Sequence, residues 1–138
     1  MKHIIFVEDN DMDFFSIQRL YQKAGLDERY TIHRFVSAEA CLDFIAAHKK
    51  LITNAECLFF VDINLPGMSG HTLVEKINEL SLIRSNVVML SSSQNELDIH
   101  NCYQAGADAY VVKAERYEEF ADAVLVTTKF WLEVAKRA

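Results

Sequence analysis

The stretch from Leu58 to Gly70 constrains the fold more than any other part of the chain. It begins with a short apolar run, Leu58–Val61, continues with a single carboxylate, Asp62, and then turns at Pro66-Gly67. A continuous apolar run of this length is typical of a strand that is buried on both faces of a parallel sheet, and proline and glycine end such a strand. Asp62 is therefore predicted to lie at the carboxyl end of a central strand, which is where open parallel sheets bind their ligands.

Strand-like and helix-like segments alternate along the whole chain. The predicted strands are His3–Val7, Tyr30–Phe35, Leu58–Val61, Val87–Leu90 and Ala109–Val112. Apolar residues at helical spacing predict a helix after each strand: one around Phe14–Ala24 that stops at Gly25, one capped by Ser37, one opened by Ser69 or Gly70, one from about Leu97 to Gly106, and one over Glu115–Arg137. This alternation predicts an α/β fold, a five-stranded doubly wound parallel sheet with helices on both faces. We expect one domain over residues 1–138 and no output domain.

Composition argues against several classes of function. The net charge is −6 and no run of lysine or arginine exists, which argues against nucleic-acid binding through phosphate neutralisation. No apolar segment reaches membrane length and the start does not resemble a signal peptide, so we expect no membrane association and a cytoplasmic location. The cysteines have no metal-binding or redox spacing and are expected to be buried thiols; they are Cys41, Cys57 and Cys102.

Chemically active side chains follow four of the predicted strands: Glu8 and Asp9, then Asp62, Ser91 and Lys113. Each alone is more often a cap or turn residue, but their combination at the strand ends favours a site. If the first and third strands are neighbours, three carboxylates converge, and their repulsion raises the pKa of at least one of them. An all-oxygen site of this kind suits Mg²⁺. A carboxylate beside the ion can attack a phosphoryl group, and a hydroxyl and an ammonium can hold the incoming oxygens.

These residues make the chain similar to the receiver domain of two-component response regulators, from Lys2 to about Ala135. The matching positions are Glu8-Asp9, Asp62, Leu65-Pro66-Gly67, Gly70, Ser91, Gly106-Ala107, Tyr110 and Lys113. The resemblance implies the CheY-like, flavodoxin-like strand order 2-1-3-4-5.

The resemblance also implies a phosphorylation site. Asp62 would accept a phosphoryl group from a histidine kinase. Asp9, Asp62 and the backbone carbonyl of Asn64 would bind Mg²⁺, and Glu8 would act through water.

Two further residues, Ser91 and Lys113, would hold the transferred phosphoryl group, and Tyr110 would be the aromatic residue that turns inward on activation. Ala114 departs from the family pattern, in which proline usually follows the lysine through a cis bond. A non-proline cis bond costs roughly 2.5–4 kcal/mol. The loop therefore either carries that cost or is trans and shaped differently, which leaves the position of Lys113 as the open question.

The implied function is a signalling switch that catalyses only its own phosphorylation and dephosphorylation. It would act through phosphorylation-dependent partner binding or by relaying phosphate to a histidine phosphotransfer protein. The ending Phe130-Trp131-Leu132 is similar to that of single-domain regulators paired with bacteriophytochromes, which suggests a phytochrome-type kinase.

Three alternatives stay open. The first is a degenerate receiver that serves only as a binding module. The second is a haloacid-dehalogenase-like phosphatase, which needs a second aspartate where Asn64 stands. The third is a flavodoxin-like flavin carrier, which needs a phosphate-binding loop where the acidic segment Glu8–Asp11 stands.

The last predicted helix, Glu115–Arg137, carries more apolar residues than one buried stripe requires. The stripe expected to pack on the sheet consists of Phe120, Val124, Thr127 or Thr128, Trp131 and Ala135. The remaining apolar side chains, Leu125, Phe130 and Leu132, would flank it. Scattered surface apolar residues are normal, but contiguous ones usually mark a contact. We expect a homodimer through the fourth helix, fifth strand and fifth helix, tightened by phosphorylation.

Overall fold

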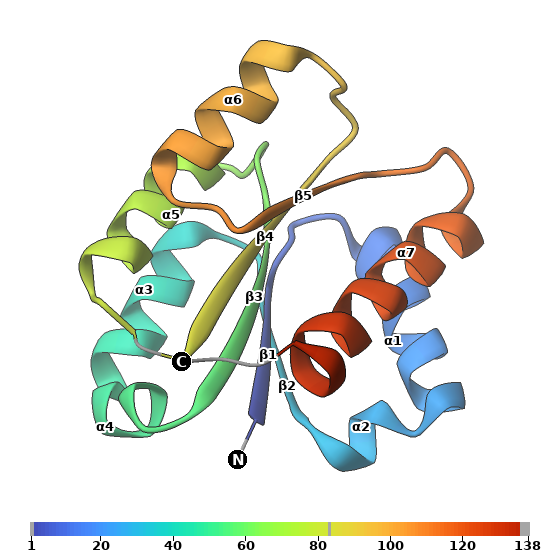
Figure 1. The fold of residues 1–138 in the computed structure, drawn as a ribbon, viewed down its shortest axis with the longest axis horizontal. Coiled ribbons are helices and arrows are strands. Elements are labelled where there is room, and N and C mark those ends of the chain that lie inside the picture. Colours follow the sequence, from blue (N-terminus) through green and yellow to red (C-terminus); the bar gives the residue numbers. More distant parts are fainter. Residues whose placement is uncertain (1, 83, 136–138) are drawn as a thin grey trace.

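A parallel five-stranded sheet forms the centre of the computed structural model, which describes residues 2–82 and 84–135 (Figure 1). The strands are β1 (Lys2–Val7), β2 (Thr31–Phe35), β3 (Glu56–Asp62), β4 (Ser85–Ser91) and β5 (Ala109–Val112). Their order is β2-β1-β3-β4-β5, and every neighbouring pair is parallel. The predicted fold class and strand order are confirmed.

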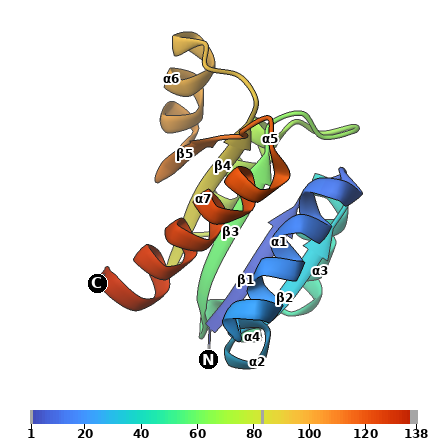
Figure 2. The same cartoon turned by 90° about the vertical axis from the view of Figure 1, so that its right-hand side faces the viewer.

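Helices cover both faces of this sheet (Figures 1 and 2). One layer contains α1 and α7, and the other contains α3, α5 and α6. The bounds are α1 (Asp11–Ala24), α2 (Leu26–Arg29), α3 (Ala38–Ala47), α4 (Lys49–Thr53), α5 (Gly70–Glu79), α6 (Glu96–Ala105) and α7 (Tyr117–Lys129). The short helices α2 and α4 were not predicted, because a single turn leaves no periodic pattern to detect. Among the described residues, no helix is both long enough and apolar enough to cross a membrane.

Strand β3 is buried on both faces, as its uninterrupted apolar sequence predicts. Successive side chains of a strand point to opposite faces, so Phe59 and Val61 belong to the core under α3, α5 and α6, whereas Phe60 belongs to the core under α1 and α7. Phe60 stacks on Phe6 of β1 with ring centroids 5.0 Å apart. The central position of β3 places the residue that follows its apolar run, Asp62, at the middle of the sheet edge.

Local capping sets where several helices begin and end. The side chains of Ser37 and Ser69 accept hydrogen bonds from backbone N–H groups in the first turns of α3 and α5, which satisfies donors that a helix leaves unpaired. Gly25 ends α1 with a φ of 74°, a left-handed conformation that glycine adopts without strain. These three predicted boundaries are confirmed.

The prediction for the last helix needs correction. It begins at Tyr117 rather than Glu115 and changes at Phe130 into a π-helical segment, η1 (Phe130–Val134); residues 136 and 137 lie outside the described part of the chain. A π turn contains more residues than an α turn, so it rotates the following side chains relative to the regular pattern. Leu132 is therefore buried, with 4% of its surface exposed, and does not flank the stripe as predicted. Phe130, at 48% exposed, does lie on the surface.

Candidate functional site

Three carboxylates converge at the carboxyl ends of β1 and β3. These strands pair in register as far as Val7 and Val61, so the residues that follow, Glu8-Asp9 and Asp62, meet at the same edge. One carboxylate oxygen of each lies within 4.8 Å of the others. Glu8 is fully buried, Asp62 is 6% exposed and Asp9 is exposed. The cluster therefore has one side open to solvent, through which a cation could approach.

A single ammonium group offsets part of this negative charge. Lys113 Nζ lies 2.6 Å from Glu8 Oε1, 2.9 Å from Asp62 Oδ2 and 2.8 Å from Asp13 Oδ2. An ammonium has three N–H donors, so each one has a carboxylate acceptor. The structure thus brings Lys113 to the site, as predicted, and adds Asp13.

Asp13 was missed in the sequence because an acidic residue in the first turn of a helix is usually explained by the helix dipole. The sequence offered only its place in the first turn of the helix that follows β1 and the acidic pair Glu8-Asp9. This place brings Asp13 near the strand end but does not fix the direction of its side chain, so the contact with Lys113 is known only from the structure.

Burial and charge shift the proton equilibria of the cluster. Burial, together with the nearby carboxylate of Asp62, raises the pKa of Glu8 from 4.5 to about 8. For Lys113, burial alone would lower the pKa, but hydrogen bonds to Asp13, Glu8 and Asp62 outweigh it and raise the pKa above its usual value of 10.5. Lys113 therefore stays cationic, whereas Glu8 exchanges a proton near neutral pH.

The raised pKa of Glu8 predicts that binding of a divalent cation such as Mg²⁺ at this cluster would depend on pH. Below pH of about 8 the cation must displace a proton from Glu8, so affinity should rise with pH by up to roughly tenfold per unit until that value. The stability of the metal-free protein should change in the opposite sense: the folded state binds more protons than the unfolded state between pH 4.5 and about 8, so stability falls as pH rises through this window.

Isothermal titration calorimetry with Mg²⁺ and thermal melts in chelator, both from pH 5 to 9, measure these two effects. Glu8→Gln is the control, because it removes the titrating carboxyl and should flatten both profiles. A wild-type affinity that does not change across this range would contradict the role of Glu8.

Ser91 ends β4 one residue beyond the register partner of Asp62, which is Leu90. Its backbone carbonyl accepts a hydrogen bond of 2.8 Å from the N–H of Lys113, so the ends of β4 and β5 are tied together. The Ser91 hydroxyl is buried and accepts a bond of 3.1 Å from the N–H of Ser93. The Lys113–Ala114 peptide is trans, since the described residues contain no cis bond. Lys113 reaches the carboxylates without the proline that is usual at the position of Ala114.

The loop after Asp62 folds back onto the strand end. The N–H of Asn64 donates to Asp62 Oδ1 at 3.0 Å, and the N–H of Gly70 donates to the carbonyl of Ile63 at 3.0 Å. Gly70 sits so close that a Cβ there would overlap the carbonyl oxygen of Asp62 and lie 2.9 Å from Ile63 Cα. The absence of a side chain at Gly70 is thus what lets α5 begin against the site.

Gly70→Ala is accordingly expected to destabilise the protein by about 1–3 kcal/mol, the usual cost of forcing extra atoms into a packed region, and to weaken Mg²⁺ binding by displacing Asp62. Urea denaturation and metal titration measure both effects. Gly25→Ala is the matched control: its Cβ would meet nothing within 4 Å, so only the strain of its positive φ remains and Mg²⁺ affinity should not change. An Mg²⁺ affinity of Gly70→Ala equal to that of wild type would contradict the packing argument.

Tyr110 connects the site to α6. Its hydroxyl donates a 2.8 Å hydrogen bond to the carbonyl of Ser93, and the Ser93 hydroxyl donates at 2.6 Å to Asp98 of α6. Because the N–H of Ser93 is also bonded to Ser91, a change at Ser91 can reach both Tyr110 and α6 through one residue. Tyr110 is half-buried and packs against the core under α3, α5 and α6.

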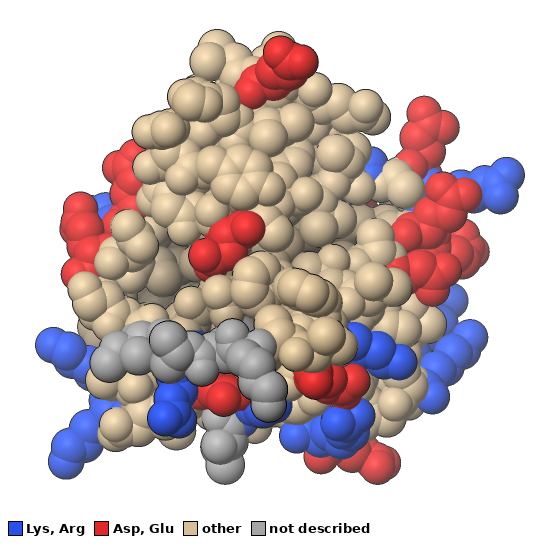
Figure 3. Space-filling view, in the orientation of Figure 1, with Lys and Arg blue, Asp and Glu red and all other residues tan. Residues whose placement is uncertain are grey.

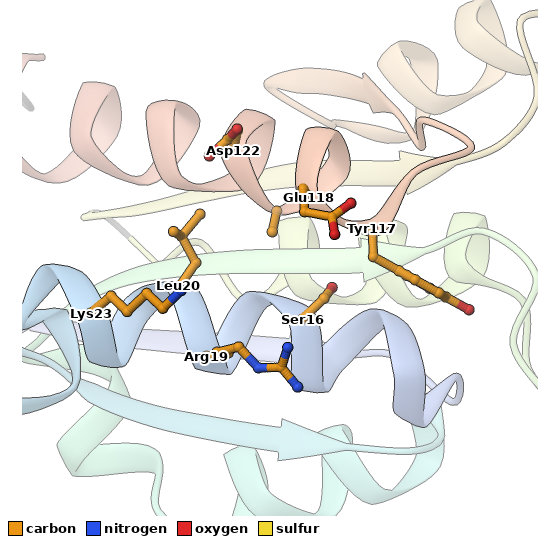
Figure 4. A pocket seen from close by; sticks show the side chains of 8 residues that line it. Ser16, Arg19, Leu20, Lys23, Tyr117, Glu118 and Asp122 are labelled. Atoms are coloured by element: carbon orange, nitrogen blue, oxygen red, sulfur yellow. The ribbon is translucent and has the colours of Figure 1, made fainter.

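A groove of about 310 Å³ runs between α1 and α7 (Figure 4). Helix α1 contributes basic side chains, Arg19 and Lys23, and α7 contributes acidic ones, Glu118 and Asp122, with Tyr117 at the α7 start. These helices begin just after the strand ends that carry Asp9 and Lys113. The groove therefore offers charges of both signs on the face beside the carboxylate cluster.

Comparisons with known proteins agree with this geometry. The family model described as the response regulator receiver domain matches residues 4–125. The response regulator Rcp1 of Synechocystis sp. is 27% identical over 134 residues, which cover 96% of this chain and 90% of Rcp1. The methanogenesis regulatory protein FilR2 of Methanothrix harundinacea, itself described as probable, is 25% identical over 94% of this chain and 83% of its own length.

Solved structures show the same similarity. The Mn²⁺-bound form of Rcp1 superimposes with a TM-score of 0.82 at 25% identity, covering 100% of this chain and 99% of the other. The phosphorylated cyanobacterial phytochrome response regulator RcpA gives a TM-score of 0.85 at 25% identity, covering 99% and 97%. The similarity therefore extends over the sheet, both helical layers and the strand ends that carry the carboxylates.

Proposed function

Because this chain belongs to the response regulator receiver domain family, we propose that it is a signalling switch whose Asp62 accepts a phosphoryl group from a histidine kinase in a Mg²⁺-dependent reaction. The observation that carries the proposal is the position of Asp62, between the acidic pair Glu8-Asp9 and the ammonium of Lys113. A receiver that served only as a binding module would not need this complete set.

The donor set fits a hard divalent cation. Glu8, Asp9 and Asp62 supply oxygen ligands within a small volume, which is the chemistry that Mg²⁺ prefers, and we assign the backbone carbonyl of Asn64 as a further ligand. When bound, the cation would neutralise part of the negative charge of the cluster and of the incoming phosphoryl oxygens. The similarity to an Mn²⁺-bound response regulator supports a divalent cation at this position.

The reaction that we propose is a single phosphoryl transfer. An oxygen of the Asp62 carboxylate attacks phosphorus, the bond between phosphorus and the donor histidine nitrogen breaks, and an acyl phosphate forms on Asp62. Lys113 and the Ser91 hydroxyl then donate hydrogen bonds to the phosphoryl oxygens. Hydrolysis of the acyl phosphate returns Asp62 to the carboxylate, so the chain acts only on itself.

The experiment that tests this proposal is incubation with acetyl phosphate and Mg²⁺, followed by intact mass measurement. We expect a mass increase of one phosphoryl group, which is absent when a chelator replaces Mg²⁺. A protein that stays unmodified in Mg²⁺ would contradict the proposal. Mn²⁺ in place of Mg²⁺ tests how strictly the reaction depends on the cation.

We assign the α1–α7 groove as the surface on which the kinase docks. It lies beside the open side of the cluster, and its paired charges can complement a helical partner (Figure 4). Exposed apolar side chains near the start of α1, Met12 and Phe15, can add contact area. The similarity to a phytochrome response regulator favours a phytochrome-type kinase as the donor. A histidine phosphotransfer protein would use the same surface if the chain relays its phosphate onward. We propose a cytoplasmic location, in which such partners would meet the chain.

We further propose that a homodimer forms through α6, β5 and α7. Figure 3 shows that the surface over α6 and β5 and beside α7 carries few charged side chains. Exposed apolar residues lie on both helices: Leu97 and Tyr103 on α6 and Val126 on α7. Phe130, the residue that follows the end of α7, is exposed as well. Because Tyr110 lies on β5 in this surface, phosphorylation can tighten the dimer if the dimer prefers one Tyr110 position.

A charged substitution on this surface should therefore abolish dimerisation. Val126, at 67% exposed, is a suitable position, because Val126→Glu adds charge without disturbing the core. Val36→Glu is the matched control, since Val36 is also exposed but lies between β2 and α3. Light scattering with and without beryllofluoride should show a dimer for wild type and Val36→Glu, and a monomer for Val126→Glu. Wild type that stays monomeric in both states would contradict the proposed dimer.

A further inference from the structure

Asp13 is largely buried against the carboxylate cluster, although it belongs to the first turn of α1. Its carboxylate accepts a 2.8 Å hydrogen bond from Lys113, and 14% of its side chain is exposed. Its neighbour on the same turn, Asp11, is 67% exposed and pairs with Arg34 instead. Both are acidic residues in the first turn of α1, but only Asp13 faces the carboxylate cluster.

Two hydrogen bonds fix the backbone of Asp13 at the start of α1. The N–H of Asp13 donates to the side chain of Asn10, the N-cap of α1, at 3.0 Å. The carbonyl of Asp13 accepts a 2.7 Å bond from the Ser16 hydroxyl. The helix terminus is thus already capped by Asn10, so capping does not require the Asp13 carboxylate.

Asp13 is also separate from the cation ligands. The close group of possible ligands consists of Glu8, Asp9 and Asp62, and Asp13 does not belong to it. When a cation binds to that group and a phosphoryl group forms on Asp62, two of the three acceptors of Lys113 change their partners. The bond from Lys113 to Asp13 is the one that neither event has to break.

We infer that Asp13 is a positioning residue that holds the ammonium of Lys113 beside Asp62 before, during and after phosphoryl transfer. The inference rests on the proposed function, because it assigns Lys113 to the phosphoryl oxygens. In this chain Ala114 follows Lys113 where the family usually has proline. The ion pair between Lys113 and Asp13 of α1 restrains the lysine side chain independently of the loop that contains Ala114. A group held in the reacting geometry loses less freedom in the transition state.

The test compares phosphorylation rates with acetyl phosphate at saturating Mg²⁺. Asp13→Asn keeps the shape of the side chain and removes its charge. We expect the phosphorylation rate to fall by about tenfold and the affinity for beryllofluoride to fall by a comparable factor. Mg²⁺ affinity, measured by calorimetry, should not fall. Asp11→Asn is the matched control, because it removes the same charge from the same turn, and its rate should equal that of wild type. Asp13→Glu keeps the charge and should restore part of the rate.

A double-mutant cycle separates positioning from a general structural effect. In a Lys113→Ala background, Asp13→Asn should cause no further loss, because no ammonium is left to position. An equal loss in both backgrounds would overturn the inference, as would identical rates for Asp13→Asn and Asp11→Asn. Thermal melts check that each variant is folded. If Asp13→Asn does not fold, Asp13→Ser is a second variant that removes the charge. Failure of wild type to become phosphorylated would instead contradict the proposed function itself.

Discussion

Asp62→Asn is expected to remove all incorporation of phosphoryl groups. The amide is not a competent nucleophile for forming an acyl phosphate, and the neighbouring carboxylates are poorly placed to replace it. Glu8 is fully buried and bonded to Lys113, and Asp9 is exposed after the end of β1, whereas Lys113 donates to Asp62. Intact mass after incubation with acetyl phosphate and Mg²⁺ measures the effect.

Asp43→Asn on the exposed side of α3 is the control for this experiment, because it removes a carboxylate far from the strand ends. It should label to the same extent as wild type. Retained labelling of Asp62→Asn at the wild-type level would show that another residue accepts the phosphoryl group and would exclude Asp62 as the only acceptor.

Asp9→Ala is expected to change two properties in opposite directions. Loss of the exposed carboxylate should lower Mg²⁺ affinity on the order of a hundredfold or more, because the site is then left with too few charged oxygens. Above a pH of about 8, where Glu8 is also ionised, the metal-free protein should become more stable, with a melting temperature higher by roughly 2–6 °C, because one of three like charges within 4.8 Å is gone. After this substitution the ammonium of Lys113 faces three carboxyl groups instead of four.

Calorimetric titration with Mg²⁺ and thermal melts in chelator test the two parts separately. Unchanged Mg²⁺ affinity would contradict the assignment of Asp9 as a ligand. A large loss of stability in chelator would contradict the repulsion argument and leave the metal assignment intact. Asp43→Ala serves as the control in both experiments, since neither property should change.

The parts of the fold that depend on short-range sequence patterns could be predicted. The apolar run Leu58–Val61 lies in β3, the glycine at position 25 ends α1, and Ser37 and Ser69 cap their helices. Each of these features is determined by residues within a few positions of one another. The convergence of Glu8, Asp9 and Asp62 could also be predicted, because parallel strands present their carboxyl ends at the same edge.

Features that depend on three-dimensional packing could not be predicted from the sequence. The burial of Leu132 follows from a π turn that no local sequence pattern predicts. The contact between Lys113 and Asp13 joins residues 100 positions apart. In each case the position of the side chain depends on a contact with another helix or strand. The sequence around that residue does not show which residues will make this contact.

The site holds four carboxylates around one ammonium, and this imbalance makes its two expected ligands cooperate. The carboxylates are Glu8, Asp9, Asp13 and Asp62, and the ammonium is that of Lys113. An anionic phosphoryl group is repelled by this surplus of negative charge, whereas a divalent cation cancels much of it. Thermodynamic linkage then requires reciprocity: if the cation favours the phosphorylated form, the phosphorylated form holds the cation more tightly by the same factor. Loss of the phosphoryl group would consequently loosen the cation as well, so the chain would return to its resting state in both respects through a single hydrolysis.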